Sequence, residues 1–147
     1  MPMFPPPMNP SLASPPAPES RPRPLRILYA DDVRELREVA RISFTREGHA
    51  IECVDDGAAA LDRIGSSPDL DLVITDHHMP TLNGLELVKA LRAGVAPFAG
   101  KIIVFSSELS PEVARKYREL AVDRILYKPV FPSHLREVLR ELFPAAR

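Results

Sequence analysis

The sequence has one cysteine and no tryptophan, and neither sign of charge is in excess. A lone thiol cannot form a disulfide within the chain, and Cys53 lies in the apolar stretch HAIECV, so we expect an unreactive cysteine in the core. The 19 Lys and Arg residues nearly balance the 20 Asp and Glu residues, and the pI is near 6.4. This balance argues against a broad basic surface, and we expect no nucleic-acid partner.

Long apolar runs are also missing from the sequence. No stretch approaches the roughly 20 apolar residues that a membrane-spanning helix needs. The opening residues, MPMFPPPMNP, lack the basic patch and apolar segment of a signal peptide. We therefore expect no membrane partner and a cytoplasmic location.

Proline is concentrated at one end of the chain. Ten of the 17 prolines fall between Pro2 and Pro24, where there is little to bury. Such a segment cannot offset its ordering entropy, so we predict a disordered proline-rich tail over residues 1–24. Its PxxP spacings could bind an aromatic groove, but a plain linker explains them more simply. Residues 25–147 then form the one domain that a chain of 147 residues has room for.

From Leu25 onward, short apolar runs alternate with amphipathic stretches. The runs predict five strands: LRILYA (25–30), AIECV (50–54), LDLVIT (70–75), KIIVFS (101–106) and RILY (124–127). The amphipathic stretches predict five helices: 33–47, a short one through Leu61 and Ile64, 85–93, one after the N-cap Ser110, and one after Ser133. Short apolar strands that alternate with helices indicate a parallel sheet. We predict a doubly wound α/β domain with five parallel strands and helices on both faces.

Polar side chains follow four of these strands at the points where the strands end. Asp31 and Asp32 follow the first strand, Asp76 the third, Ser106 closes the fourth, and Lys128 follows the fifth. In a flavodoxin-like strand order, 2-1-3-4-5, these groups meet at one edge of the sheet. Two carboxylates about 4 Å apart repel each other by roughly 4 kcal/mol at an effective dielectric constant near 20. Three of them beside one lysine therefore predict a site for a hard divalent ion, and an open all-oxygen site suits Mg²⁺.

The run Asp76-His77-His78 allows a second interpretation, in which all three side chains bind a metal in a hydrolase. Such an enzyme needs separated acids after its first strand and further histidines downstream. Here the acids are adjacent, and the other histidines, His49 and His134, are predicted to lie away from this edge. We therefore favour Asp76 as the reactive residue, a carboxylate nucleophile for phosphoryl transfer.

From about Leu25 to Phe143 the sequence resembles the receiver domain of two-component response regulators. The resemblance rests on the acidic pair, on the pattern D-x-x-M-P-x-x-[ND]-G from Asp76 to Gly84, on a hydroxyl after the fourth strand and on Lys-Pro after the fifth. Each piece alone is weak, but the combination is highly specific. Because little sequence follows the last helix, we expect a stand-alone, single-domain receiver.

The resemblance implies a role for each residue at the edge of the sheet. Asp76 would be the phosphoacceptor, and Asp31, Asp32 and Asp76 would hold the metal, with Asp32 as a direct ligand. His78 would add its backbone carbonyl as a further metal ligand.

The resemblance also implies the parts of a switch. Ser106 would be the switch hydroxyl, Lys128 would contact the phosphoryl group, and the Lys128–Pro129 bond would be cis. The family usually has an aromatic residue three positions before the lysine, where this chain has Ile125. An inward-swinging aromatic therefore cannot operate in the usual form.

The function that follows is a phosphorylation-dependent signalling switch rather than a turnover enzyme. The phosphodonor would be a histidine kinase or a histidine phosphotransfer protein, with Mg²⁺ as cofactor. A downstream protein would bind the face formed by the fourth helix, fifth strand and fifth helix, or the phosphate would be relayed onward. We expect a monomer or a phosphorylation-dependent dimer. The rival is a metal-dependent phosphatase with an aspartyl nucleophile, but that class carries an Asp-x-Asp loop after its first strand.

Overall fold

The computed structural model describes residues 23–144. The chain has two compact units: residues 24–132, which hold the sheet and four helices, and a second unit that includes Arg23 and residues 133–144, with most of the last helix. Nearly all of the predicted proline-rich tail, residues 1–22, lies outside the described residues. Within the described part of the chain, no helix is both long enough and apolar enough to span a bilayer.

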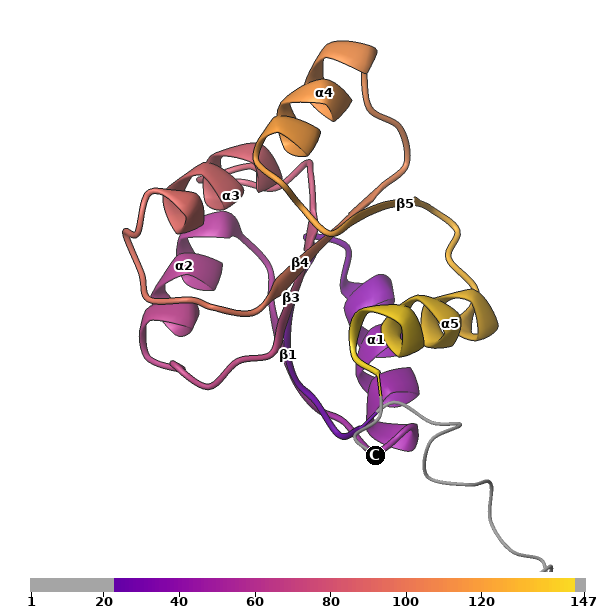
Figure 1. Ribbon diagram of the computed structural model, residues 1–147. Helices are drawn as coiled ribbons and strands as arrows, with labels where there is room; N and C mark the ends of the chain where they lie inside the picture. Colours follow the sequence, from indigo (N-terminus) through magenta and orange to yellow (C-terminus); the bar gives the residue numbers. More distant parts are fainter. Residues whose placement is uncertain (1–22, 145–147) are drawn as a thin grey trace, which may run out of the picture. The chain divides into compact units, whose positions relative to one another are not determined.

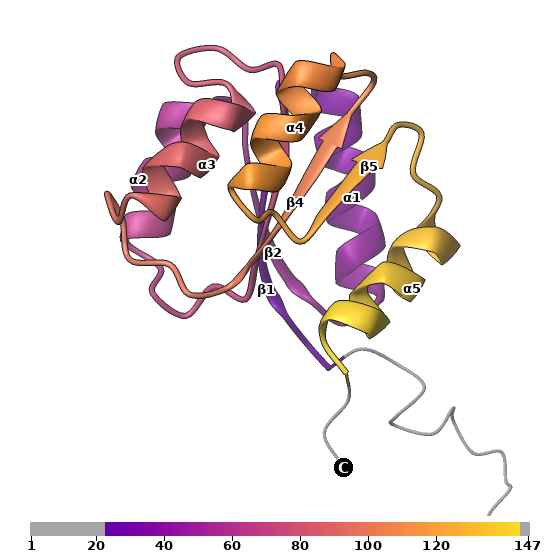
Figure 2. The same ribbon diagram turned by 45° about the horizontal axis from the view of Figure 1, so that its top comes forward.

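The first unit contains one parallel sheet of five strands in the order β2-β1-β3-β4-β5. The strands are β1 (Arg26–Ala30), β2 (Ala50–Val54), β3 (Leu72–Asp76), β4 (Lys101–Ser106) and β5 (Arg124–Tyr127). Figure 2 shows β4 and β5 side by side with their arrowheads pointing the same way. The predicted fold class and strand order are confirmed.

The strand sequences explain their places in the sheet. Every residue of β3, LVITD, is buried, as expected of a central strand that is covered on both faces. The edge strands β2 and β5 are only partly buried. The prediction that β3 begins at Leu70 is wrong by two residues. The Leu70 amide donates instead to the Ser67 carbonyl in the turn after the preceding helix.

Four helices accompany the sheet in the first unit. They are α1 (Arg34–Arg46), α2 (Gly57–Gly65), α3 (Gly84–Arg92) and α4 (Pro111–Glu119). Polar caps fix where three of them begin: Asp56 caps α2, Asn83 and Glu86 form a capping box on α3, and the Ser110 side chain accepts from the Val113 amide at the start of α4. The predicted N-cap at Ser110 is therefore confirmed.

Helices cover both faces of the sheet. In Figure 1, α1 lies on one face of the strands, whereas α2 and α3 lie on the other. The core on the second face combines one face of the inner strands with residues of three helices, among them Ile64 of α2, Leu87 of α3 and Tyr117 of α4. In the strands, residues of this core such as Leu28 and Val73 alternate with residues such as Ile27 and Ile74, which point to the side of α1.

The fifth helix, α5 (Pro132–Leu142), belongs mainly to the second unit. It begins at Pro132, whereas the sequence predicted a start after Ser133, and the fixed φ of proline suits the first turn of a helix. Its residues Val138 and Leu139 are buried.

Candidate functional site

Three carboxylates lie together where the central strands end. Asp31 and Asp32 follow β1, and Asp76 is the last residue of the neighbouring strand β3. One oxygen atom from each of the three lies within 4.8 Å of the others. Lys128, directly after β5, reaches the same cluster, with its Nζ 3.0 Å from Asp31 Oδ2 and 3.3 Å from Asp76 Oδ2. Three negative charges therefore share a single close ammonium group.

Asp31 is fully buried, with 0% of its surface exposed. Its Oδ2 atom accepts from the Tyr29 hydroxyl at 3.1 Å and from Lys128 Nζ at 3.0 Å. Its Oδ1 atom accepts from the Val33 amide at 2.9 Å. These three donors satisfy the carboxylate oxygens and occupy lone pairs that a metal ion would otherwise use.

Asp76 is 6% exposed and is held by two donors. Its Oδ1 accepts from the His77 amide at 2.8 Å, and its Oδ2 faces Lys128. Burial raises the pKa of Asp76 above its ordinary value, Lys128 opposes this rise, and the charge of Asp31 adds to it. The ionised carboxylate of Asp76 is therefore destabilised by burial, and a nearby cation would stabilise it.

Asp32 differs from its neighbour Asp31 because it is exposed. Its carboxylate lies at the mouth of the cluster, where an ion that keeps several water molecules could reach it. A set of three carboxylate oxygens with an open side, and a negative net charge after Lys128 is included, fits Mg²⁺. Asp31, Asp32 and Asp76 are the side chains that would hold the ion.

Two further predicted residues lie beside the cluster. Ser106 is fully buried at the end of β4, and its hydroxyl donates to the Glu108 carbonyl at 3.0 Å. The Ser106 carbonyl accepts from the Lys128 amide at 2.8 Å, which joins the ends of β4 and β5. The next peptide bond, Lys128–Pro129, is cis.

Comparisons with known proteins identify the family. The family model of the response regulator receiver domain matches residues 27–140. The chain belongs to this family. The phosphatase alternative is therefore not favoured.

Several relatives of this receiver are similar over most of its length. A CheY homologue, a chemotaxis protein of Campylobacter jejuni, is 31% identical over 120 residues, which cover 80% of this chain and 92% of the homologue. The sensory/regulatory protein RpfC of Xanthomonas campestris is 33% identical over 132 residues, or 87% of this chain. This chain spans only 18% of RpfC and 12% of the sensor histidine kinase AruS of Pseudomonas aeruginosa, which is 31% identical.

Solved structures give the same result. The structure of the chemotaxis protein CheY4 of Vibrio cholerae superposes with a TM-score of 0.73 at 27% identity, and the match covers 82% of this chain and 99% of CheY4. A CheY-like receiver domain protein of Methanospirillum hungatei superposes with a TM-score of 0.72 at 26% identity, over 80% of this chain and 92% of that protein.

His77 and His78 do not join the acid cluster as side-chain ligands. The described residues contain one group of potential metal ligands, and it consists of the three aspartates alone. His77 is buried, and its Nδ1 is hydrogen-bonded to the Tyr117 hydroxyl at 2.6 Å. The His78 ring is exposed and packs edge-on against the His77 ring, 4.8 Å between centroids. The metallo-hydrolase interpretation has no support from this arrangement.

The position of the missing aromatic is filled by a packed aliphatic side chain. Ile125 is partly buried and packs against the core cluster on the face of α2, α3 and α4. Tyr127, two residues further on, is 50% exposed. Neither residue places an aromatic ring where the family usually has one.

Sequence reasoning missed two tyrosines near the acids. Tyr29 donates to Asp31, and the signal was present, because residues two apart on a strand share a face. Tyr117 contacts His77 across 40 positions of sequence, and no local pattern indicates that contact. Burial raises the pKa of both phenols, so both hydroxyls keep their protons at neutral pH.

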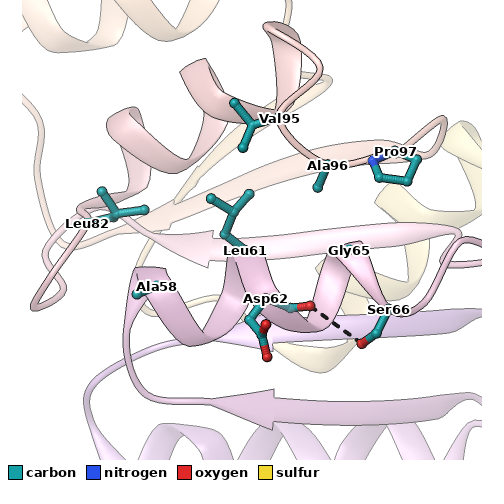
Figure 3. Close-up of a pocket in the computed structure, with 9 residues that line it drawn as sticks. All are labelled: Ala58, Leu61, Asp62, Gly65, Ser66, Leu82, Val95, Ala96 and Pro97. Carbon is teal, nitrogen blue, oxygen red and sulfur yellow. Dashed lines mark hydrogen bonds between the residues drawn. The ribbon is translucent and has the colours of Figure 1, made fainter.

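A separate groove of about 670 Å³ lies along α2 and the loop after α3. Figure 3 shows its lining, which is mainly apolar and includes Leu61, Leu82 and Val95. None of the three clustered aspartates lines it, and its one carboxylate belongs to Asp62. The groove is therefore not part of the acid cluster.

Proposed function

We propose that Asp76 accepts a phosphoryl group from the phosphohistidine of a histidine kinase or a histidine phosphotransfer protein, and that the resulting acyl phosphate changes how this receiver binds a downstream protein. The observation that carries the proposal is the position of Lys128, whose ammonium lies within 3.3 Å of the carboxylates of both Asp31 and Asp76. In a member of this family, that geometry provides a nucleophile and a cation for the incoming phosphoryl oxygens.

The transfer itself requires positioning more than acid–base chemistry. A carboxylate oxygen of Asp76 attacks phosphorus, the new O–P bond forms as the P–N bond to the donor imidazole breaks, and the imidazole nitrogen keeps the electron pair and takes a proton from solvent. The His77 amide holds Oδ1 of the nucleophile, and Lys128 is placed to bind a phosphoryl oxygen. Bound at the three aspartates, Mg²⁺ would neutralise charge on the other phosphoryl oxygens.

The switch begins with new acceptors for two existing donors. The Ser106 hydroxyl donates to the Glu108 carbonyl before transfer, and a phosphoryl oxygen is a stronger, charged acceptor. Lys128 is shared between two aspartates before transfer and gains a group with roughly −1.5 to −2 charges afterwards. To move an inactive-to-active equilibrium from 1:99 to 99:1, the phosphoryl group must favour the active form by about 5.5 kcal/mol.

Stoichiometric labelling tests this function against the phosphatase alternative. The purified chain is incubated with Mg²⁺ and radiolabelled acetyl phosphate, and bound label is counted after denaturation. We expect about one equivalent of acid-stable, base-labile label per chain, since one carboxylate reacts. Asp76→Asn should abolish the label, and EDTA should prevent it.

Asp62→Asn is the matched control, because Asp62 is an exposed carboxylate on α2 away from the cluster. It should label like the wild type. Label that persists in Asp76→Asn would refute the assignment of the phosphoacceptor. Sustained release of phosphate from p-nitrophenyl phosphate, over many turnovers, would support the phosphatase instead.

A further inference from the structure

Helix α4 carries one buried aromatic residue, Tyr117, which is 0% exposed. Its hydroxyl is hydrogen-bonded to Nδ1 of His77 at 2.6 Å, and the two rings meet edge to face with centroids 5.6 Å apart. Tyr117 and Ala114 are the two buried residues of α4. The most deeply buried contact of this helix therefore ends on the residue next to Asp76.

His77 is in turn bonded to the phosphoacceptor through its backbone. Its amide donates to Asp76 Oδ1 at 2.8 Å, and its carbonyl accepts from the Gly84 amide at 2.8 Å. Its ring also supports the ring of His78. A displacement of the His77 backbone would consequently move its ring, which is hydrogen-bonded to Tyr117 of α4.

The chain keeps space for the tyrosine hydroxyl at this point. A Cβ atom on Gly84 would lie 2.6 Å from the Tyr117 hydroxyl oxygen and 2.5 Å from the Asp76 carbonyl oxygen. Real Cβ atoms do not come that close to other atoms, so only glycine allows the hydroxyl to reach the Asp76–His77 segment. This observation is independent of the hydrogen bond and indicates the same close approach.

A phenylalanine would fill the same apolar space in the core without a polar group to satisfy. Burying a hydroxyl costs free energy unless it has a partner, and here the partner is the imidazole beside the phosphoacceptor. The family's usual aromatic position holds Ile125, which has no hydroxyl and no ring to move. Tyr117 is the buried tyrosine that joins an outer helix to the phosphoryl site.

We propose that Tyr117 is a positioning residue of the phosphoryl site, which acts through His77 to hold the amide that donates to Asp76 and which transmits the state of Asp76 to helix α4. The proposal rests on the proposed function. When Asp76 becomes an acyl phosphate, its carboxyl loses its negative charge, and the bond from the His77 amide changes from charge-assisted to neutral. The His77 backbone is then less firmly held, and the bond to Tyr117 carries its displacement to α4.

Hydrogen exchange measured by mass spectrometry tests this link in the full chain. Amide exchange in α4, residues 111–119, is compared with Mg²⁺ alone and with Mg²⁺ plus beryllofluoride, a stable mimic of the phosphoryl group. In the wild type we expect the exchange rate in α4 to change on adding beryllofluoride. Tyr117→Phe keeps the ring and removes the hydroxyl, and it should reduce that change by about fivefold, the factor that corresponds to one hydrogen bond.

The readout is a difference between two ligand states, which a tyrosine with a merely structural role would not alter. His77→Phe removes the imidazole partner and should have the same effect, so the test survives if one variant fails to fold. Tyr127→Phe is the matched control, because it removes the hydroxyl of an exposed tyrosine on β5. It should leave the response of α4 unchanged.

Two kinds of failure are distinguishable. If beryllofluoride with Mg²⁺ does not raise the thermal midpoint of the wild type, the phosphoryl site does not bind the mimic, and both the proposed function and this inference are overturned. If the midpoint rises but α4 does not respond, or responds equally in wild type, Tyr117→Phe and His77→Phe, the proposed function stands and the role of Tyr117 is overturned.

Discussion

Replacing Lys128 by Met removes the ammonium group that forms ion pairs with the carboxylates of Asp31 and Asp76. Lys128 is 16% exposed, and the carboxylates of its partners Asp31 and Asp76 are buried. At 3.0 and 3.3 Å, and with an effective dielectric constant near 20, each attraction is worth about 5 kcal/mol before desolvation. Methionine has a similar shape, so the change removes charge rather than volume.

The net loss is smaller than the Coulomb attraction, because the lysine regains its hydration on unfolding. Removing one partner of a buried ion pair typically costs about 3–5 kcal/mol, since the remaining charge is left without compensation. We expect Lys128→Met to lower the free energy of unfolding by about 3 kcal/mol or more without Mg²⁺. The total free energy of unfolding of a domain of this size is only about 5–15 kcal/mol.

Mg²⁺ should then stabilise the variant more than the wild type. The cluster loses its positive charge, so it should bind a divalent cation about tenfold more tightly, which adds about 1.4 kcal/mol at saturating metal. Urea unfolding followed by circular dichroism, with EDTA and with Mg²⁺, measures both effects. The same pocket should bind acetyl phosphate poorly, because the phosphoryl oxygens have lost Lys128.

Lys101→Met is the matched control for this experiment. Lys101 lies 3.9 Å from Asp123 and is 41% exposed, so its ion pair should contribute less than about 1 kcal/mol. A loss below about 1 kcal/mol for Lys128→Met, or an unchanged affinity for Mg²⁺, would refute the electrostatic account of the cluster.

Three smaller predictions concern neighbouring residues. Gly84→Ala should lower the free energy of unfolding by about 2–3 kcal/mol, because the new Cβ would lie 2.5 Å from the Asp76 carbonyl oxygen, and a variant as stable as the wild type in urea would show that α3 can shift. Burial lowers the pKa of His49 below its ordinary 6.5, so its contribution to stability is present above about pH 6.5 and is lost as the pH falls through the lowered value. When the free energy of unfolding is measured at a series of acidic pH values, it should fall less steeply with decreasing pH for His49→Gln than for the wild type, and equal slopes would contradict the assignment. Tyr29→Phe removes one donor from Asp31 Oδ2, so calorimetric titration should show about fivefold tighter Mg²⁺ binding, whereas weaker binding would mean that the hydroxyl orients the carboxylate for the ion.

The sequence allowed the elements and the acid cluster to be predicted because both depend on local pattern. Three strands, 50–54, 101–106 and 124–127, have the predicted bounds, since each is an apolar run with a clear break at both ends. The cluster followed from one rule, that the carboxyl ends of parallel strands meet at one edge. The strand order was taken from the flavodoxin-like type of doubly wound fold, and the hydrogen-bonded strand pairs bear it out.

The features that the sequence could not predict depend on how deeply each side chain is buried and on contacts between segments far apart in the sequence. Asp31 and Asp32 are identical and adjacent in sequence, yet one is buried with three donors and the other is exposed. The alternation of side chains separates the two faces of a strand, but it does not say which face lies deeper. The contact between Tyr117 and His77 depends on how α4 settles against α3, which is decided by packing over the whole core.

Helix α4 has few buried residues to hold it against the sheet. Of its nine residues only Ala114 and Tyr117 are buried, whereas α3, of equal length, buries five. Local opening is easiest where few apolar contacts must be broken, so α4 should detach from the sheet at a far smaller free energy than global unfolding requires. For a protein that binds only the detached helix, the hydrogen bond between Tyr117 and His77 would then control access to its binding surface.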